Sequence, residues 1–174
     1  MKKMLAALLA LACLLGLTAC DPGWARVDGE ELLSNTVKIQ LVEYENTAPK
    51  YYRLGRKQQA CFDFDQTTLL AELDEFGFED LINDIASYDL MVFDMALNEP
   101  IGKTLILYQS NGNMIVLFGG VHQYDNGRKK IFGQCNVYDE TGKLVDYLGD
   151  ISSNYVDELA ERYFGSQDLA SANY

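Results

Sequence analysis

Hydrophobic and polar residues alternate along several short stretches of the chain, and this pattern predicts strands. The first clear example is 36–45, where Val37, Ile39 and Leu41 alternate with Lys38 and Gln40. A period of two residues places the apolar side chains on one face of a strand. Alternation, or a short apolar run bounded by turn residues, predicts further strands over 61–70, 90–96, 104–109, 114–118, 120–125, 129–139 and 143–148.

A second periodicity, of three to four residues, predicts two amphipathic helices. Asp74 is a candidate N-cap for a helix over 75–87, because its side chain can accept a hydrogen bond from a free backbone N–H of the first turn. The apolar positions of this helix are Phe78, Leu81, Ile82 and Ile85. The second helix follows the cap candidates Ser152, Ser153 and Asn154, and its apolar positions are Val156, Leu159, Ala160, Tyr163 and Phe164.

Turn residues indicate how the strands connect. Asn126-Gly127 is a strong hairpin signal, because both central residues of a type I′ turn need positive φ. Together with the turns at 110–113 and 139–142, it predicts three successive hairpins. We therefore expect an α+β fold, in which an antiparallel sheet of six or seven strands carries two helices. The absence of a parallel βαβ rhythm argues against a doubly wound nucleotide-binding fold.

The N-terminal residues have the layout of a secretory signal. Lys2 and Lys3 provide a positive start, 4–15 is apolar, and small residues follow up to Ala19. The apolar run is too short to span a bilayer, which needs about 20 apolar residues. The segment 1–19 is therefore expected to be a signal peptide.

Leu17-Thr18-Ala19-Cys20 resembles the lipobox of bacterial lipoproteins. The resemblance implies cleavage after Ala19 and a diacylglyceryl group on the thiol of Cys20, which would hold the protein at the outer side of the cytoplasmic membrane. The alternative is an ordinary secretory signal with an unrelated cysteine nearby. The remaining chain is expected to form a short lipidated tether over 20–34, one domain over 35–165 and a polar tail over 166–174.

The domain itself is similar to small uncharacterised lipoproteins of Gram-positive bacteria. The likeness lies in the segments VKIQLVEYEN (37–46) and LILYQSNGNMIVL (105–117). It implies no particular functional residues.

The charge of the chain limits its partners. The formal net charge is −12, and removal of Lys2 and Lys3 with the signal changes it to −14. Nucleic acids need a basic surface, so they are not expected as partners. The same charge argues against the domain lying flat on anionic lipid.

Two cysteines, Cys61 and Cys135, remain in the domain. An exported protein permits a disulfide between them, and the alternative is two buried free thiols. We expect both to lie on interior strands of one sheet, bridged or nearly so.

Two stretches are candidates for binding. The expected loop over 46–59 carries Lys50, Tyr51, Tyr52 and Arg53, and cations beside aromatic rings can hold a sugar or an anionic polymer. The alternative is an ordinary solvated loop.

The second stretch is acidic. From Gln58 to Gly102 there are eleven acids and no Lys, Arg or His, and Glu79, Asp80 and Asp84 lie together on the first helix. They form either an acidic face for a basic partner or divalent cations, or a face whose repulsion the basic loop at 50–57 relieves.

No motif indicates catalysis, a resident metal or a cofactor. The one histidine, His122, has no cysteine near it in the sequence, and the chain has no Gly-x-Ser-x-Gly motif and no Cys/His cluster for zinc. The expected function is a non-enzymatic binding domain, a lipoprotein that holds a protein or envelope component. The alternative is a hydrolase that cleaves cell-wall or glycan substrates with two carboxylates.

Overall fold

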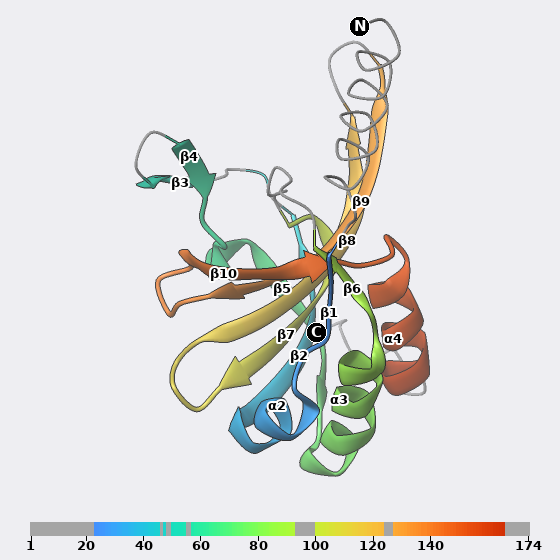
Figure 1. The fold of residues 1–174 in the computed structure, drawn as a ribbon. Helices are drawn as coiled ribbons and strands as arrows, with labels where there is room; N and C mark the ends of the chain where they lie inside the picture. Colours follow the sequence, from blue (N-terminus) through green and yellow to red (C-terminus); the bar gives the residue numbers. More distant parts are fainter. Residues whose placement is uncertain are drawn as a thin grey trace, which may run out of the picture.

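The protein is described by a computed structural model for residues 23–45, 47, 50–54, 57–92, 100–123 and 127–165. The expected signal peptide, Cys20 and the polar tail lie outside the described residues. In chain order the elements are β1 (Gly23–Ala25), α2 (Gly29–Asn35), β2 (Thr36–Tyr44), β3 (Tyr51–Leu54), β4 (Lys57–Ala60), η2 (Phe64–Gln66), β5 (Thr67–Leu73), η3 (Glu75–Gly77), α3 (Phe78–Ser87), β6 (Leu90–Val92), β7 (Gly102–Gln109), β8 (Met114–Gln123), β9 (Lys129–Tyr138), β10 (Leu144–Asp150) and α4 (Tyr155–Phe164) (Figure 1).

An eight-stranded antiparallel sheet in the order β1-β6-β10-β9-β8-β7-β2-β5 forms the centre of the molecule. The three expected hairpins are present as β7–β8, β8–β9 and β9–β10. The α+β class is confirmed, but the described residues form eight strands in this sheet and three α-helices, rather than six or seven strands and two helices.

The extra strand and helix come from the stretch expected to be a tether. Residues 23–25 form β1, which pairs with β6, and 29–35 form α2. Asp28 caps α2 by accepting hydrogen bonds from the backbone N–H groups of Glu30 and Glu31, and Leu32 is only 3% exposed. The expected tether is therefore wrong for residues 23–34, which belong to the folded domain.

The two expected helices are confirmed with small shifts. Asp74 accepts a hydrogen bond from the N–H of Gly77, but the turn that it caps is the 3-10 helix η3, and α3 begins at Phe78. All four apolar positions predicted for α3 are buried. The apolar residues predicted for α4 also pack inward, with Tyr163 partly buried.

The expected strand over 61–70 begins only at Thr67. Residues 61–63 are irregular, η2 follows, and Asp63 caps η2 by accepting a hydrogen bond from the N–H of Asp65.

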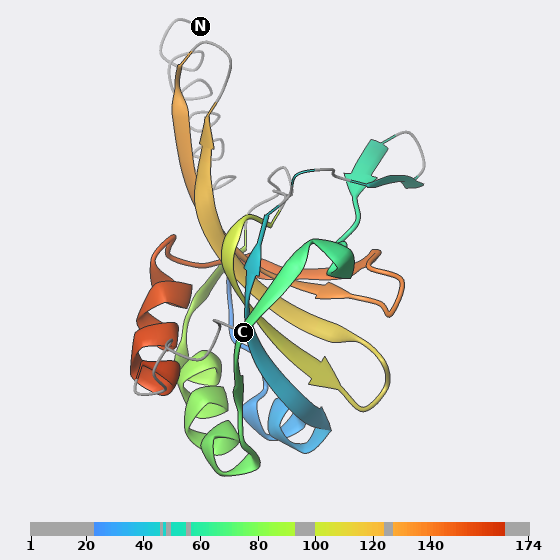
Figure 2. The ribbon, with the colours of Figure 1, turned by 180° about the vertical axis from the view of Figure 1, so that it is seen from behind.

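The expected loop over 46–59 contains instead the two-stranded hairpin β3–β4, which stands apart from the main sheet (Figure 2). Of the strand expected over 90–96, Leu90–Val92 forms β6, and 93–96 lies outside the described residues.

The segment after β10 crosses directly over β8 and β9. Gly119 and Gly133 pair across these strands, and a Cβ at either position would lie within 2.7 Å of the Ser153 or Ser152 carbonyl oxygen. The Ile151 N–H also donates to the Gly133 carbonyl at 2.9 Å. The two glycines thus permit the close crossing that brings α4 onto the sheet, and beyond them β8 and β9 continue as a projecting ribbon (Figure 1).

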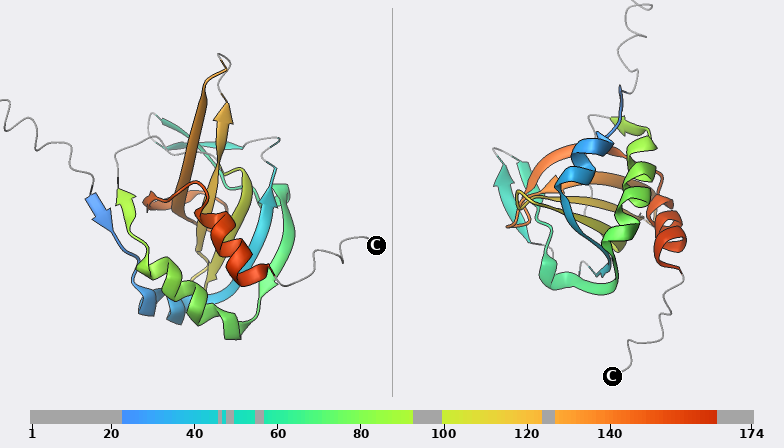
Figure 3. Two further views of the ribbon diagram at one scale, coloured as in Figure 1. Left: turned by 90° about the vertical axis from the view of Figure 1, so that its right-hand side faces the viewer. Right: turned by 90° about the horizontal axis from the view of Figure 1, so that it is seen from below.

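Each face of the sheet carries a cluster of buried apolar residues. The helices α2, α3 and α4 lie along one face, which we call the helix face (Figure 3). The opposite face, which we call the loop face, is packed against Phe62 and Phe64 of the segment 61–66. In the part of the chain that the structure describes, no helix is long and apolar enough to cross a membrane.

Candidate functional site

A cleft of about 390 Å³ opens between α3, α4 and the start of β6. It lies where the C-terminal turn of α3 meets α4, so two segments that are distant in the chain, 84–89 and 155–162, supply its walls. Its lining residues are Asp84, Ser87, Tyr88, Asp89, Tyr155 and Arg162.

Two stacked tyrosines form the apolar wall of the cleft. The rings of Tyr88 and Tyr155 have centroids 4.0 Å apart and are tilted by 32°. The Tyr155 hydroxyl donates to the Asp84 carbonyl at 3.2 Å, and the Tyr88 hydroxyl accepts from the Ser152 N–H at 2.8 Å. Burial, and then the charge of Asp84, raise the pKa of Tyr155, so this hydroxyl stays protonated. These contacts fix both rings in place.

Each carboxylate of the cleft is paired with an arginine. Arg162 on α4 contacts Asp84 on α3, and the Tyr163 hydroxyl donates to the same carboxylate at 2.7 Å. Arg26 donates through Nε to Asp89 at 2.6 Å, and this hydrogen bond lowers the pKa of Asp89. With its pKa lowered, Asp89 can accept hydrogen bonds from a ligand, but it is a poor proton donor. The two arginines and two carboxylates together give the cleft hydrogen-bond donors and acceptors for a ligand.

The cleft corrects the expectation for the acidic face. Glu79 and Asp80 are exposed, while Asp84 is partly buried and is held by Arg162. One of the two alternatives was that the basic loop at 50–57 relieves the repulsion on this helix, but the cation that contacts Asp84 is Arg162 of α4. Lys50 instead contacts Asp63 and Asp65, in the same acidic stretch but away from α3.

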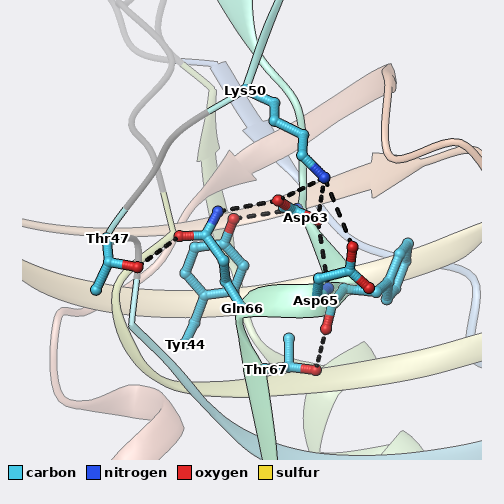
Figure 4. A network of polar contacts seen from close by, with 8 residues as sticks. Tyr44, Thr47, Lys50, Asp63, Asp65, Gln66 and Thr67 are labelled. Carbon is cyan, nitrogen blue, oxygen red and sulfur yellow. Dashed lines mark hydrogen bonds and ion pairs between the residues drawn. The ribbon is translucent and has the colours of Figure 1, made fainter.

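The four residues of the candidate binding loop do not form one site. Lys50 Nζ lies 2.9 Å from Asp63 Oδ2 and 3.6 Å from Asp65 Oδ2 (Figure 4). The Tyr52 hydroxyl accepts from the Leu144 N–H at 3.1 Å, so it ties the β3–β4 hairpin to β10. Tyr51 and Arg53 are exposed, and on β3 they alternate with Tyr52. The side chains of Lys50 and Tyr52 thus make contacts within the domain.

The two cysteines are free thiols on different parts of the fold. Cys135 lies on β9, is fully buried and packs into the helix-face cluster, and burial raises its pKa to about 12. Cys61 lies on irregular chain before η2, next to Phe62 of the loop-face cluster. The expectation of a bridged pair on interior strands of one sheet is therefore wrong, because Cys61 is not on a strand and its neighbour packs on the other face.

Sequence reasoning missed Tyr88, Asp89, Tyr155 and Arg162 as candidate site residues. The partners in the cleft are far apart along the chain, since Asp84 and Arg162 are separated by 78 residues. A local pattern carries no signal for such a pairing. Among the described residues, no group of three or more His, Cys, Asp or Glu could hold a metal ion.

Comparisons with known proteins give no family for this chain. No family model, no curated protein and no solved structure matches it.

Proposed function

We propose that this protein is a lipoprotein held at the outer side of the cytoplasmic membrane, whose α+β domain binds a protein or an envelope component. The observation that carries the proposal is the motif Leu17-Thr18-Ala19-Cys20 at the end of a charged and then apolar N-terminal stretch. Two acyl chains on Cys20 would hold the domain stably, because each buried CH₂ contributes about 0.8 kcal/mol.

The cleft between α3 and α4 is the candidate binding site of the domain. Tyrosine rings offer apolar contact area, and the paired charges offer both hydrogen-bond donors and acceptors. A ligand with an apolar part and several hydroxyl, amide or carboxyl groups suits this combination. Peptides and envelope glycans both have this chemistry.

A hydrolase is the second candidate, because one cleft contains both Asp84 and Asp89. A glycosidase needs one carboxyl group that stays protonated as the general acid. The hydrogen bond from Arg26 lowers the pKa of Asp89, so Asp89 could serve as the base or nucleophile but not as the acid. Asp84 would have to be the acid, but its carboxylate already contacts Arg162 and accepts a hydrogen bond from the Tyr163 hydroxyl. Binding is therefore the better-supported function.

The anchor is tested by changing one cysteine at a time in the full-length protein. Cys20→Ala should abolish labelling by radioactive palmitate and block cleavage after Ala19. Cys13→Ala is the matched control, because Cys13 lies in the apolar run that would be removed, and this variant should be labelled and cleaved normally. Labelled, mature protein from Cys20→Ala would contradict the proposal.

The cleft is tested by placing a photo-crosslinking residue in it. With the crosslinker at Ser87, which lines the cleft, irradiation of cells should trap a partner at higher yield than with the crosslinker at Glu140. Glu140 is an exposed residue in the turn between β9 and β10 and serves as the control. Equal yields at both positions would exclude the cleft as the binding site. A glycan released by the wild type but not by Asp84→Asn would favour the hydrolase instead.

A further inference from the structure

The single tryptophan of the chain, Trp24, lies on β1 at an edge of the sheet and is 62% exposed. Isolated exposed apolar residues are common on protein surfaces. A largely exposed indole is more unusual, because tryptophan buries a large apolar area where it finds a partner. Its place in the chain indicates what that partner is.

Trp24 is held by the fold and is not part of a loose leader. β1 pairs antiparallel with β6, with Gly23 opposite Val92, Trp24 opposite Met91 and Ala25 opposite Leu90. Leu90 is 2% exposed and belongs to the helix-face cluster, so β6 is fixed to the core. The Tyr147 hydroxyl also donates to the Met91 carbonyl at 3.5 Å. Trp24 is therefore attached rigidly to the domain, so the location of its side chain reports the orientation of the domain.

The chain between the lipid site and Trp24 is very short. If Cys20 carries the lipid, as in the function proposed above, only residues 21–23 separate it from Trp24. Four extended steps span at most about 14 Å, so Trp24 cannot lie farther than this from the lipidated residue. The polar interface of a bilayer is itself about 5–8 Å thick on each side. The anchor thus keeps Trp24 near the lipid headgroups.

We propose that Trp24 lies in the lipid–water interface of the membrane and that it sets the orientation of the domain on the bilayer. Tryptophan is enriched at this depth because its ring is apolar and its N–H is polar. Met91, which is partly exposed and lies directly opposite Trp24 on the neighbouring strand, adds apolar surface on the same face of this edge. The contact is limited to this edge, so it is compatible with a net charge that disfavours a flat approach to anionic lipid.

The test uses the intrinsic fluorescence of the full-length, processed protein in phosphatidylcholine vesicles. Mass spectrometry of the N-terminal peptide first establishes whether Cys20 carries the lipid. Lipids brominated near the top of the acyl chain should then quench Trp24 about twofold or more, and iodide in the water should quench it only weakly.

A matched variant, Trp24→Phe with Phe76→Trp, keeps one tryptophan but places it elsewhere. Phe76 is 96% exposed in η3, and the whole of α3, about 15 Å long, lies between η3 and β6. Iodide should quench this variant strongly, and brominated lipid should not. If the wild-type tryptophan behaves like the variant although Cys20 is lipidated, the inference is overturned and the anchor stands. If Cys20 carries no lipid, both fail.

Discussion

The helix face and the loop face of the sheet are covered by different kinds of structure, and the buried cluster on the helix face is the larger of the two. Three helices cover the helix face, and its core is mostly aliphatic, with Leu81, Ile82 and Leu105 fully buried. The loop face is packed against the short segment 61–66. Its core is rich in aromatic residues, and the ring of Phe62 contacts those of Tyr44, Phe64 and Tyr138.

The difference follows from the hydrogen bonds of the covering chain. A helix pairs its own backbone groups, so it can be packed against apolar side chains alone. The segment 61–66 does this only in its η2 turn, where the Gln66 N–H donates to the Asp63 carbonyl at 3.0 Å, and its first backbone groups need partners elsewhere in fixed positions. The Phe62 N–H donates to the Gly142 carbonyl at 2.7 Å, and the Asp63 N–H donates to the Tyr44 hydroxyl at 3.0 Å. The loop face is therefore held by specific polar contacts as well as by packing.

The largest effect is expected from Phe62→Ala. Phe62 is 1% exposed and is the main side chain covering the loop face, so its truncation should lower the free energy of unfolding by about 3–5 kcal/mol. Leu81→Ala on the helix face is the counterpart, with an expected loss of about 2–5 kcal/mol. Urea unfolding measures both. A loss well below that of Leu81→Ala would show that the loop face contributes little to stability.

Gly142→Ala should have the next largest effect. Gly142 has φ 76°, and a Cβ there would lie 1.9 Å from the Phe62 carbonyl oxygen. The left-handed conformation of residue 142 and the loss of the hydrogen bond from the Phe62 N–H to its carbonyl should together lower the free energy of unfolding by about 3 kcal/mol. Gly127→Ala is the matched control, because Gly127 has φ 78° but nothing within 4 Å of the added Cβ. Equal melting temperatures for the two variants would contradict the close contact between the turn and segment 61–66.

Tyr44→Phe should have a smaller effect. The change leaves the buried N–H of Asp63 without the Tyr44 hydroxyl, and should lower the free energy of unfolding by about 1–3 kcal/mol. Tyr88→Phe on the helix face also removes an acceptor from a backbone N–H, that of Ser152, but there water can replace it. Thermal unfolding should therefore separate the two variants. Equal losses of stability in the two variants would show that burial of the hydrogen bond does not change its contribution to the free energy of unfolding.

The smallest effect is expected from Lys50→Gln and depends on pH. The hydrogen bond from Lys50 lowers the pKa of Asp63, so this carboxylate stabilises the fold above its unfolded pKa of about 3.9 and less so as pH falls through its lower, folded pKa. Removing Lys50 should raise the pKa of Asp63 and shift the acid loss of stability to higher pH. Carboxyl NMR titration measures the shift, and Arg53→Gln is the control. An unchanged Asp63 titration would contradict the contact.

Much of the helix face could be predicted from the sequence. Apolar residues at helical spacing identified the buried positions of α3 and α4, because periodicity reports which side of one element faces a core. Turn residues located the three hairpins, and Gly127 and Gly142 do have positive φ. The helix α2 escaped notice because it buries a single apolar residue, Leu32. Asp28 followed by Glu31 is the signal that could have found it.

The candidate site and the loop face were decided only by the tertiary structure. Phe62 and Asp63 alternate as they would on a strand, but their partners, Gly142 and Tyr44, come from distant parts of the chain. Asp84 looked like part of an unpaired acidic face until α4 brought Arg162 to it. The amino-acid sequence by itself determines which side of a local element is apolar. It does not determine which distant element packs against that side, because this depends on the order in which the strands pair across the whole sheet.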